Sequence, residues 1–166
     1  MFEWLLIKYI KHFNKVHRDI RASNIIKSND GPAYLIDWGF AIKMEEEEDP
    51  PMYGGTKTTA SYRVLVNLKK KQGFGTHCFY PLPEDDLHSL WKTVFLAANP
   101  HLKTELLQYL HNTNNEWWIT AKKFWDNIAI VHPRTSYYFR YAQMISCEGK
   151  DYHMMCNVLE ELCENM

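Results

Sequence analysis

The sequence lacks the features that mark secreted, membrane-spanning or zinc-binding proteins. Its 4 cysteines include no C-x-x-C pair, so the spacing of a structural zinc site is absent. We expect reduced thiols in a reducing compartment. No run of ~18 uncharged apolar residues is present to span a bilayer. Residues 1–10 carry Glu3 and Lys8 and lack a small-residue cleavage site, which argues against a signal peptide.

An excess of charge of one sign is also missing. The formal net charge is -1, which provides no field to attract nucleic acid or a membrane. The one sizeable block of like charge is the acidic run Glu45–Asp49. We therefore expect an intracellular, cytoplasmic protein whose partners include neither nucleic acid nor a membrane.

Apolar and aromatic residues are plentiful by comparison. The chain has 166 residues, of which 46% are hydrophobic and 14% aromatic. This length fits one domain, 1–166, and leaves no room for two large ones. The aromatic content predicts a core built from bulky rings.

The spacing of apolar residues predicts a mainly α fold with a small antiparallel β insert. Helical periodicity occurs at about 2–13, 87–98, 117–130, 136–145 and 152–162. Short apolar runs at 24–27, 33–36 and 40–43 predict strands, and the turn-forming residues 28–32 separate the first two. Loops are expected at 44–59 and 69–83.

Two motifs fall within the strand-rich insert. Residues 17–24, from His17 to Asn24, match H-R-D-x-x-x-x-N, and Asp37-Trp38-Gly39 is a variant of D-F-G. In this order, with a turn between two strands separating them, they resemble the catalytic core of eukaryotic-type protein kinases. The resemblance implies the C-terminal lobe of a protein-kinase-like fold, and it extends to fungal kinase-like families.

The resemblance also implies a chemistry, the ATP-dependent transfer of a phosphoryl group to Ser or Thr of a protein substrate. Such transfer needs positioning and charge neutralisation more than covalent chemistry. Asp19 would accept or orient the proton of the substrate hydroxyl. Asp37 and Asn24 would bind Mg²⁺, which prefers oxygen ligands. A guanidinium at Arg21 can reach the transferred phosphate.

Other positions match the nucleotide site and its supports. Ile26 and Ile36 correspond to the apolar floor beneath the nucleotide, ATP. Among the structural positions of the family are the loop residues His17 and Arg18 and the glycine of D-F-G, here Gly39.

The resemblance continues downstream. Gly55 to Arg63 looks like the end of an activation segment whose loop spans 44–59. Its Thr56 would bond back to the catalytic loop and favours the Ser/Thr class, whereas Arg21 is found in some tyrosine kinases. Asp86-Leu87-His88-Ser89-Leu90 resembles the D-x-x-S-L start of a buried central helix. Asp86 would accept hydrogen bonds from the backbone around His17 and Arg18.

Several features depart from the family pattern. The sequence contains no Gly-rich phosphate loop, no V-A-I-K strand and no helix with the partner Glu. It begins in the helix before the catalytic loop, so we expect the N-terminal lobe and hinge to be missing and the chain alone to be weak or inactive. Trp38 replaces the usual Phe. Arg63 stands where a Glu usually anchors the activation segment, and its inverted charge puts that anchor in question.

Three functions and two roles for the acidic run stay open at this point. Besides a Ser/Thr-type kinase, the chain fits an inactive, pseudokinase-like module that binds a protein partner. A small-molecule phosphotransferase of related fold is the third interpretation. The run Glu45–Asp49 is either a solvated loop or a substitute for an activation-loop phosphate that pairs with Arg18.

Overall fold

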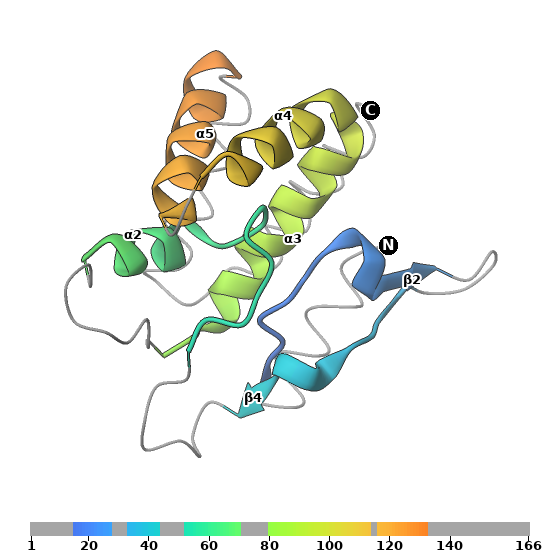
Figure 1. Cartoon of the computed structure of the whole chain (residues 1–166). Coiled ribbons are helices and arrows are strands. Elements are labelled where there is room, and N and C mark those ends of the chain that lie inside the picture. The colour runs from blue at the N-terminus through green and yellow to red at the C-terminus, as the bar shows by residue number, and fades with distance from the viewer. Residues whose placement is uncertain (1–14, 28–32, 44–51, 71–79, 114–115, 133–166) are drawn as a thin grey trace.

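The computed structural model describes residues 15–27, 33–43, 52–70, 80–113 and 116–132 (Figure 1). The helices predicted at 2–13, 136–145 and 152–162 lie outside these ranges, as does the acidic run. Over the described residues the fold is mostly helical with two small antiparallel sheets. The mainly α prediction with a β insert therefore agrees with what is described. The assignment to a kinase C-terminal lobe stays a prediction.

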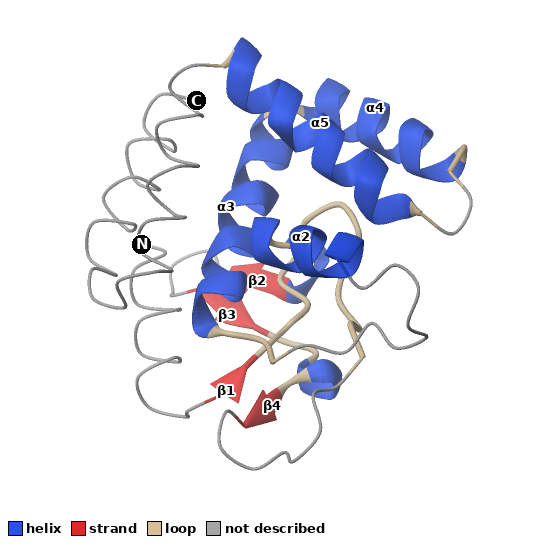
Figure 2. Ribbon diagram, turned by 90° about the vertical axis from the view of Figure 1, so that its left-hand side faces the viewer, coloured by secondary structure: helices blue, strands red, loops and turns tan. Residues whose placement is uncertain are grey.

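Four α-helices form the larger part of the described structure. They are α2 (Tyr62–Lys70), α3 (Pro83–Ala98), α4 (Pro100–His111) and α5 (Trp117–Val131). Helix α3 contacts both α2 and α4, and α5 packs against the same two helices. Figure 2 shows the strands beside the lower part of α3, with α4 and α5 at the opposite end.

Helix α3 is the most deeply buried element. Pro83 occupies its first turn, where a missing N–H costs nothing, and Glu84, Asp85 and Asp86 place negative charge at its amino end. Most of its residues are buried, polar ones included. The predicted helix at 87–98 is confirmed, and it begins earlier, at Pro83.

Two helices were not predicted. Helix α2 begins within the segment interpreted as the end of an activation loop, and the predicted loop at 69–83 is wrong for its first two residues, which belong to α2. The periodic signal was present, because Val64, Leu65 and Leu68 are all buried. Helix α4 begins at Pro100, because proline favours the first helical position.

Two pairs of short strands carry the motif region. Strand β2 (Ile25–Lys27) pairs antiparallel with β3 (Ala33–Leu35), and β1 (Lys15–Val16) pairs antiparallel with β4 (Ile42–Lys43). The predicted runs overlap β2, β3 and β4, but their ends differ, and no run was predicted at β1. Asn24 belongs to a 3₁₀ turn, η1 (Ala22–Asn24), and Phe40 to another, η2 (Trp38–Phe40). These turns bend the chain beside the motif residues, which period-two patterns do not reveal.

Large aromatic side chains fill the core between α3 and α5. Trp91 stacks on Phe95 at 5.5 Å between ring centroids, and Trp125 lies 5.9 Å from both rings. Phe124 meets Trp125 edge-on. Such pairs stabilise a core by about 0.5–1.5 kcal/mol each beyond the area they bury. The predicted aromatic core is thus confirmed for the described residues.

Candidate active site

Asp86 holds the backbone of the loop that contains the first motif. Its carboxylate accepts hydrogen bonds from the backbone N–H of His17 at 2.6 Å and of Arg18 at 2.8 Å. These are the bonds predicted from the resemblance. Arg18 has φ of 72°, in the left-handed region that a bulky residue seldom adopts. Strain of this kind costs about 1–3 kcal/mol and persists where neighbouring contacts enforce it. Asp86 makes such contacts.

The imidazole of His17 lies beneath this loop. Its Nε2 lies 2.9 Å from the carbonyl oxygen of Ile36, and its Nδ1 is 3.3 Å from the backbone N of Asp19. Nε2 must therefore carry the proton while Nδ1 accepts. Burial is the main cause of a lowered His17 pKa, which favours this neutral form. The Trp38 ring meets the imidazole edge-on at 4.5 Å, so the larger ring that replaces Phe is packed.

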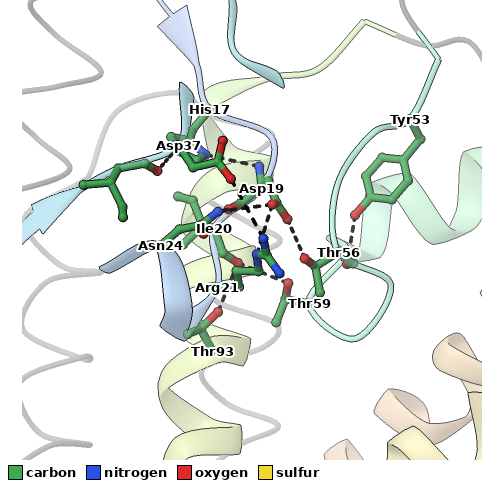
Figure 3. Close-up of polar contacts among 11 residues, drawn as sticks. His17, Asp19, Ile20, Arg21, Asn24, Asp37, Tyr53, Thr56, Thr59 and Thr93 are labelled. Carbon is green, nitrogen blue, oxygen red and sulfur yellow. Dashed lines mark hydrogen bonds and ion pairs between the residues drawn. The ribbon is translucent and has the colours of Figure 1, made fainter. Parts of the chain in front are cut away.

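The carboxylate of Asp19 has interaction partners on both of its oxygens (Figure 3). Its side chain is 5% exposed. One oxygen, Oδ2, accepts from Asn24 Nδ2 at 3.1 Å and lies 3.1 Å from Arg21 Nε. The other, Oδ1, accepts from the Thr56 hydroxyl. A carboxylate with partners on both oxygens is fixed in orientation, as a positioned base requires.

Asp37 faces the same place from the end of β3. It has φ of 62° and a side chain that is 50% exposed, in contrast to buried Asp19. The guanidinium of Arg21 lies between the two aspartates, 3.9 Å from Asp37 Oδ2. The backbone N–H of Ile36 donates to Asn24 O at 2.9 Å and ties this strand end to the loop. Asp19, Arg21, Asn24 and Asp37 are thereby brought together.

The oxygen atoms of Asn24 and Asp37 are suitable ligands for a hard cation. The amide nitrogen of Asn24 donates to the carbonyl oxygen and carboxylate of Asp19, which turns its amide oxygen the other way. That oxygen and the Asp37 carboxylate are ligand types that Mg²⁺ prefers. Within the described ranges, no set of three or more His, Cys, Asp or Glu is gathered for a metal. The predicted pair is a smaller set, of the kind completed by phosphates and water.

The predicted floor residues lie in and beside the β2–β3 sheet: Ile26 belongs to β2, and Ile36 directly follows β3. Ile26 is 50% and Ile36 38% exposed. Both are therefore accessible apolar side chains, as a nucleotide floor would require, and their role stays a prediction. Gly39 follows Asp37 closely, and a Cβ there would meet only Asp37 Oδ1 at 3.5 Å. Its conformation does not require glycine.

The segment from Tyr53 to Ser61 packs against the loop. Thr56 bonds to Asp19, as predicted, and the Thr59 hydroxyl donates to Ile20 O at 3.1 Å. A Cβ on Gly55 would collide with the carbonyl oxygen of Arg18. Glycine at 55 therefore permits the close approach of the two backbones.

Arg18 joins two more distant points of the chain. Its guanidinium donates to Phe40 O at 3.3 Å and to Met52 O. These carbonyl groups flank the acidic run on either side. The predicted pairing of Arg18 with Glu45–Asp49 lies outside the described residues, so it stays a prediction.

Arg63 has an anchor, although the sequence put its anchoring in question. Its guanidinium forms an ion pair with Asp85 through two nitrogens and also donates to Tyr80 O at 2.8 Å. Asp85 in turn accepts from the Ser61 hydroxyl and from Leu82 N at 2.9 Å. Arg63 lies in the first turn of α2, and Asp85 lies in the first turn of α3. The signal was an extra acid directly before Asp86.

Lys92 was not identified from the sequence either. It lies in the middle of α3 with 0% exposure, and its Nζ donates to Ala60 O at 2.5 Å. A lysine at an apolar position of a buried helical stripe was the available signal.

Comparison with known proteins gives one informative similarity. No protein-family model matches the chain. A probable serine/threonine-protein kinase of Dictyostelium discoideum is 33% identical to it over 143 residues. The match takes in 83% of this chain but 21% of that kinase, so the chain spans about a fifth of the relative's length. The similarity supports a kinase-like relationship. Separately, no helix among the described residues has the length and apolar character needed to cross a membrane.

Proposed function

We propose that this chain is the C-terminal lobe of a protein-kinase-like domain that transfers phosphoryl groups from Mg-ATP to Ser or Thr of proteins. The observation that carries the proposal is the set of contacts around Asp19. A buried carboxylate is oriented by Asn24, Arg21 and Thr56, opposite the accessible carboxylate of Asp37. The related kinase of Dictyostelium supports the same interpretation.

The proposed roles follow from the geometry of these side chains. Asp19 orients the substrate hydroxyl and accepts its proton. Asp37 and the amide oxygen of Asn24 hold Mg²⁺, which neutralises charge on the phosphates when bound. Arg21 already lies between the two carboxylates, where a transferred phosphoryl group would carry its negative charge. Positioning and electrostatics of this kind supply most of the rate in phosphoryl transfer.

The isolated chain should be a weak enzyme. Kinases cover the phosphates with a Gly-rich loop and contact them with a strand Lys, and the 166 residues contain neither motif. Ile26 and Ile36 provide one apolar face only. We therefore expect weak Mg-ATP binding and slow or undetectable transfer by this chain alone.

A binding experiment separates the roles of the two aspartates. Mn²⁺ replaces Mg²⁺ and broadens the NMR signals of nearby nuclei, so Mn-ATP should broaden the amides around Asn24 and Asp37 in the purified chain. Asp37→Asn should abolish this localised broadening, because it removes a charged ligand. Asp19→Asn should preserve it. Asp126→Asn, on the surface of α5, is the control.

In a form of the protein that transfers phosphate, Asp19→Asn should lower kcat by at least 100-fold with little change in ATP binding. Equal loss of Mn-ATP binding in both variants would contradict the assigned roles. Broadening spread over the whole surface would contradict the site itself.

A non-catalytic role is the alternative. The carboxylate of Asp19 has partners on both oxygens without any ligand. Ile26 and Tyr34 on the β2–β3 sheet, and Ile36 directly after β3, are exposed apolar side chains. An inactive module that binds a protein partner would have such features. It is favoured if Mn-ATP leaves every amide unaffected.

A further inference from the structure

The buried lysine of α3 and a tryptophan of α5 hold one irregular segment between them. Lys92 Nζ lies 4.7 Å from the centroid of the Trp125 ring, close enough for a cation–π interaction. Lys92 donates to the carbonyl oxygen of Ala60, and the Trp125 indole N–H donates to that of Thr58 at 3.1 Å. Both side chains are fully buried. The segment is thus fixed from its inner side at alternate residues.

The opposite side of the same segment faces the candidate active site. Thr59 donates to Ile20 O, and Thr56 donates to Asp19. Thr93, the neighbour of Lys92 on α3, also donates to Ile20 O at 3.2 Å. The segment is therefore held between the two helices and the loop that carries Asp19.

A lysine at a core position costs more free energy of desolvation than an apolar residue would. Burial opposes its charge and lowers the Lys92 pKa well below the ordinary value. Leu or Met would pack there without that cost, but neither can donate to Ala60 O. Ala60 is buried outside any helix or strand, and buried carbonyl groups need hydrogen-bond partners. Lys92 supplies the hydrogen bond that a helix or strand would otherwise provide to this carbonyl group.

We propose that Lys92 and Trp125 are positioning residues that fix the Thr58–Ala60 backbone and so hold the Thr56 hydroxyl against Asp19. The consequence for catalysis rests on the proposed function, whereas the effect on the segment does not. Loss of either donor should release residues 55–61 while the helices remain folded.

Hydrogen exchange of the full 166-residue chain tests the effect on the segment. Lys92→Met and Trp125→Phe each remove one donor but keep most of the packing volume. Both should raise the exchange rates of the amides of residues 55–61 at least tenfold, with changes below twofold in α4. Lys122→Met is the matched control, because Lys122 also lies over a ring, Tyr62 at 4.8 Å, but bonds to Asp126 at 2.7 Å.

The readouts decide between positioning and general stabilisation. Faster exchange at 55–61 in both variants supports the proposal. Unchanged exchange there, or equal acceleration throughout α3, α4 and α5, overturns it. If one variant does not fold, the other decides. Where phosphate transfer is measurable, Lys92→Met should lower kcat at least tenfold and leave the KM for ATP within twofold. If Mn-ATP broadened no amide around Asn24 and Asp37 in the wild-type chain, the proposed function would be refuted and the exchange result would still stand.

Discussion

Two adjacent carboxylates at the start of α3 serve different parts of the chain. Asp86 accepts hydrogen bonds from the backbone N–H groups of His17 and Arg18. Asp85 accepts hydrogen bonds from the side chains of Ser61 and Arg63. Both are buried. These two neighbouring residues at the start of α3 therefore link the Asp19 loop to the Tyr53–Ser61 segment.

The Arg63–Asp85 pair should show strong coupling. The Arg63 side chain is 31% and the Asp85 side chain 9% exposed, so the interaction is only partly screened. We expect Arg63→Met and Asp85→Asn each to lower the free energy of unfolding, and the double variant to lose less than the sum. The coupling should be about 0.5–3 kcal/mol, as for residues in one network.

Urea unfolding of the four proteins measures this cycle. Lys122→Met with Asp126→Asn provides a comparison cycle on a more exposed pair, where about 0.3–0.5 kcal/mol is typical. Additive losses at Arg63 and Asp85 would show that the pair does not anchor the segment.

The ionisation of Asp86 should make stability depend on pH. Burial raises its pKa from 3.8 to about 7, against the opposing effect of the two backbone N–H donors. The folded state therefore holds this proton more tightly than the unfolded state. The contribution of Asp86 to the free energy of unfolding falls as pH rises from about 4 to 7 and is constant above that range.

Comparison with Asp86→Asn isolates this contribution, because His17 and other groups titrate in both proteins. The stability of the wild type minus that of Asp86→Asn should decrease from pH 4 to 7. A difference that is flat or increases with pH would contradict a raised pKa of Asp86 in the folded state.

At the scale of elements, the close approach of the Tyr53–Ser61 segment to the Asp19 loop depends on one missing side chain. Gly55→Ala places a Cβ against the Arg18 carbonyl, and such overpacking costs about 1–3 kcal/mol. Gly39→Ala is the control, because its Cβ has only an ordinary contact. We expect a lower thermal midpoint and faster hydrogen exchange at residues 53–61 in Gly55→Ala alone. Equal effects of the two substitutions would argue against a tight contact at 55.

The sequence predicted elements well where periodicity or turn chemistry was unambiguous. Apolar spacing located α3 and α5, and the turn-forming residue types at 28–32 located the boundary between β2 and β3. Helix α2 was missed because its start overlaps a loop motif, and α4 was missed although it begins at a proline. A pattern of side-chain polarity does not distinguish a proline that ends a helix from one that begins it.

The residues of the candidate site also fall into those that the sequence identified and those that it did not. His17, Asp19, Asn24, Asp37, Thr56 and Asp86 were identified from motif spacing, and the predicted contacts of Thr56 and Asp86 are present. Arg63, Asp85, Lys92 and Trp125 interact through partners remote in the sequence. Nothing local in the chain specifies such partners. The role of Arg63 became interpretable only with its partner Asp85 in place.

Across the molecule, α3 connects the pieces of the candidate site. From Asp85 to Thr93 its polar side chains reach the Asp19 loop, the Tyr53–Ser61 segment and Arg63. These contacts fix the relative positions of parts that share no strand or helix. Polar residues in so buried a helix serve position more than stability.

The guanidinium of Arg18 has a consequence for how this chain tolerates changes in length. By donating to both Phe40 O and Met52 O, it joins the two ends of the segment that lies between them in the sequence. Doubling the length of such a loop costs only about 0.6 kcal/mol of closure entropy. Short Gly-Ser insertions after Glu46 should thus leave the thermal midpoint nearly unchanged, whereas the same insertions in Arg18→Met should lower it further. An unchanged midpoint in the wild type and a lowered one in Arg18→Met would show that this side chain, rather than the intervening sequence, fixes the two ends.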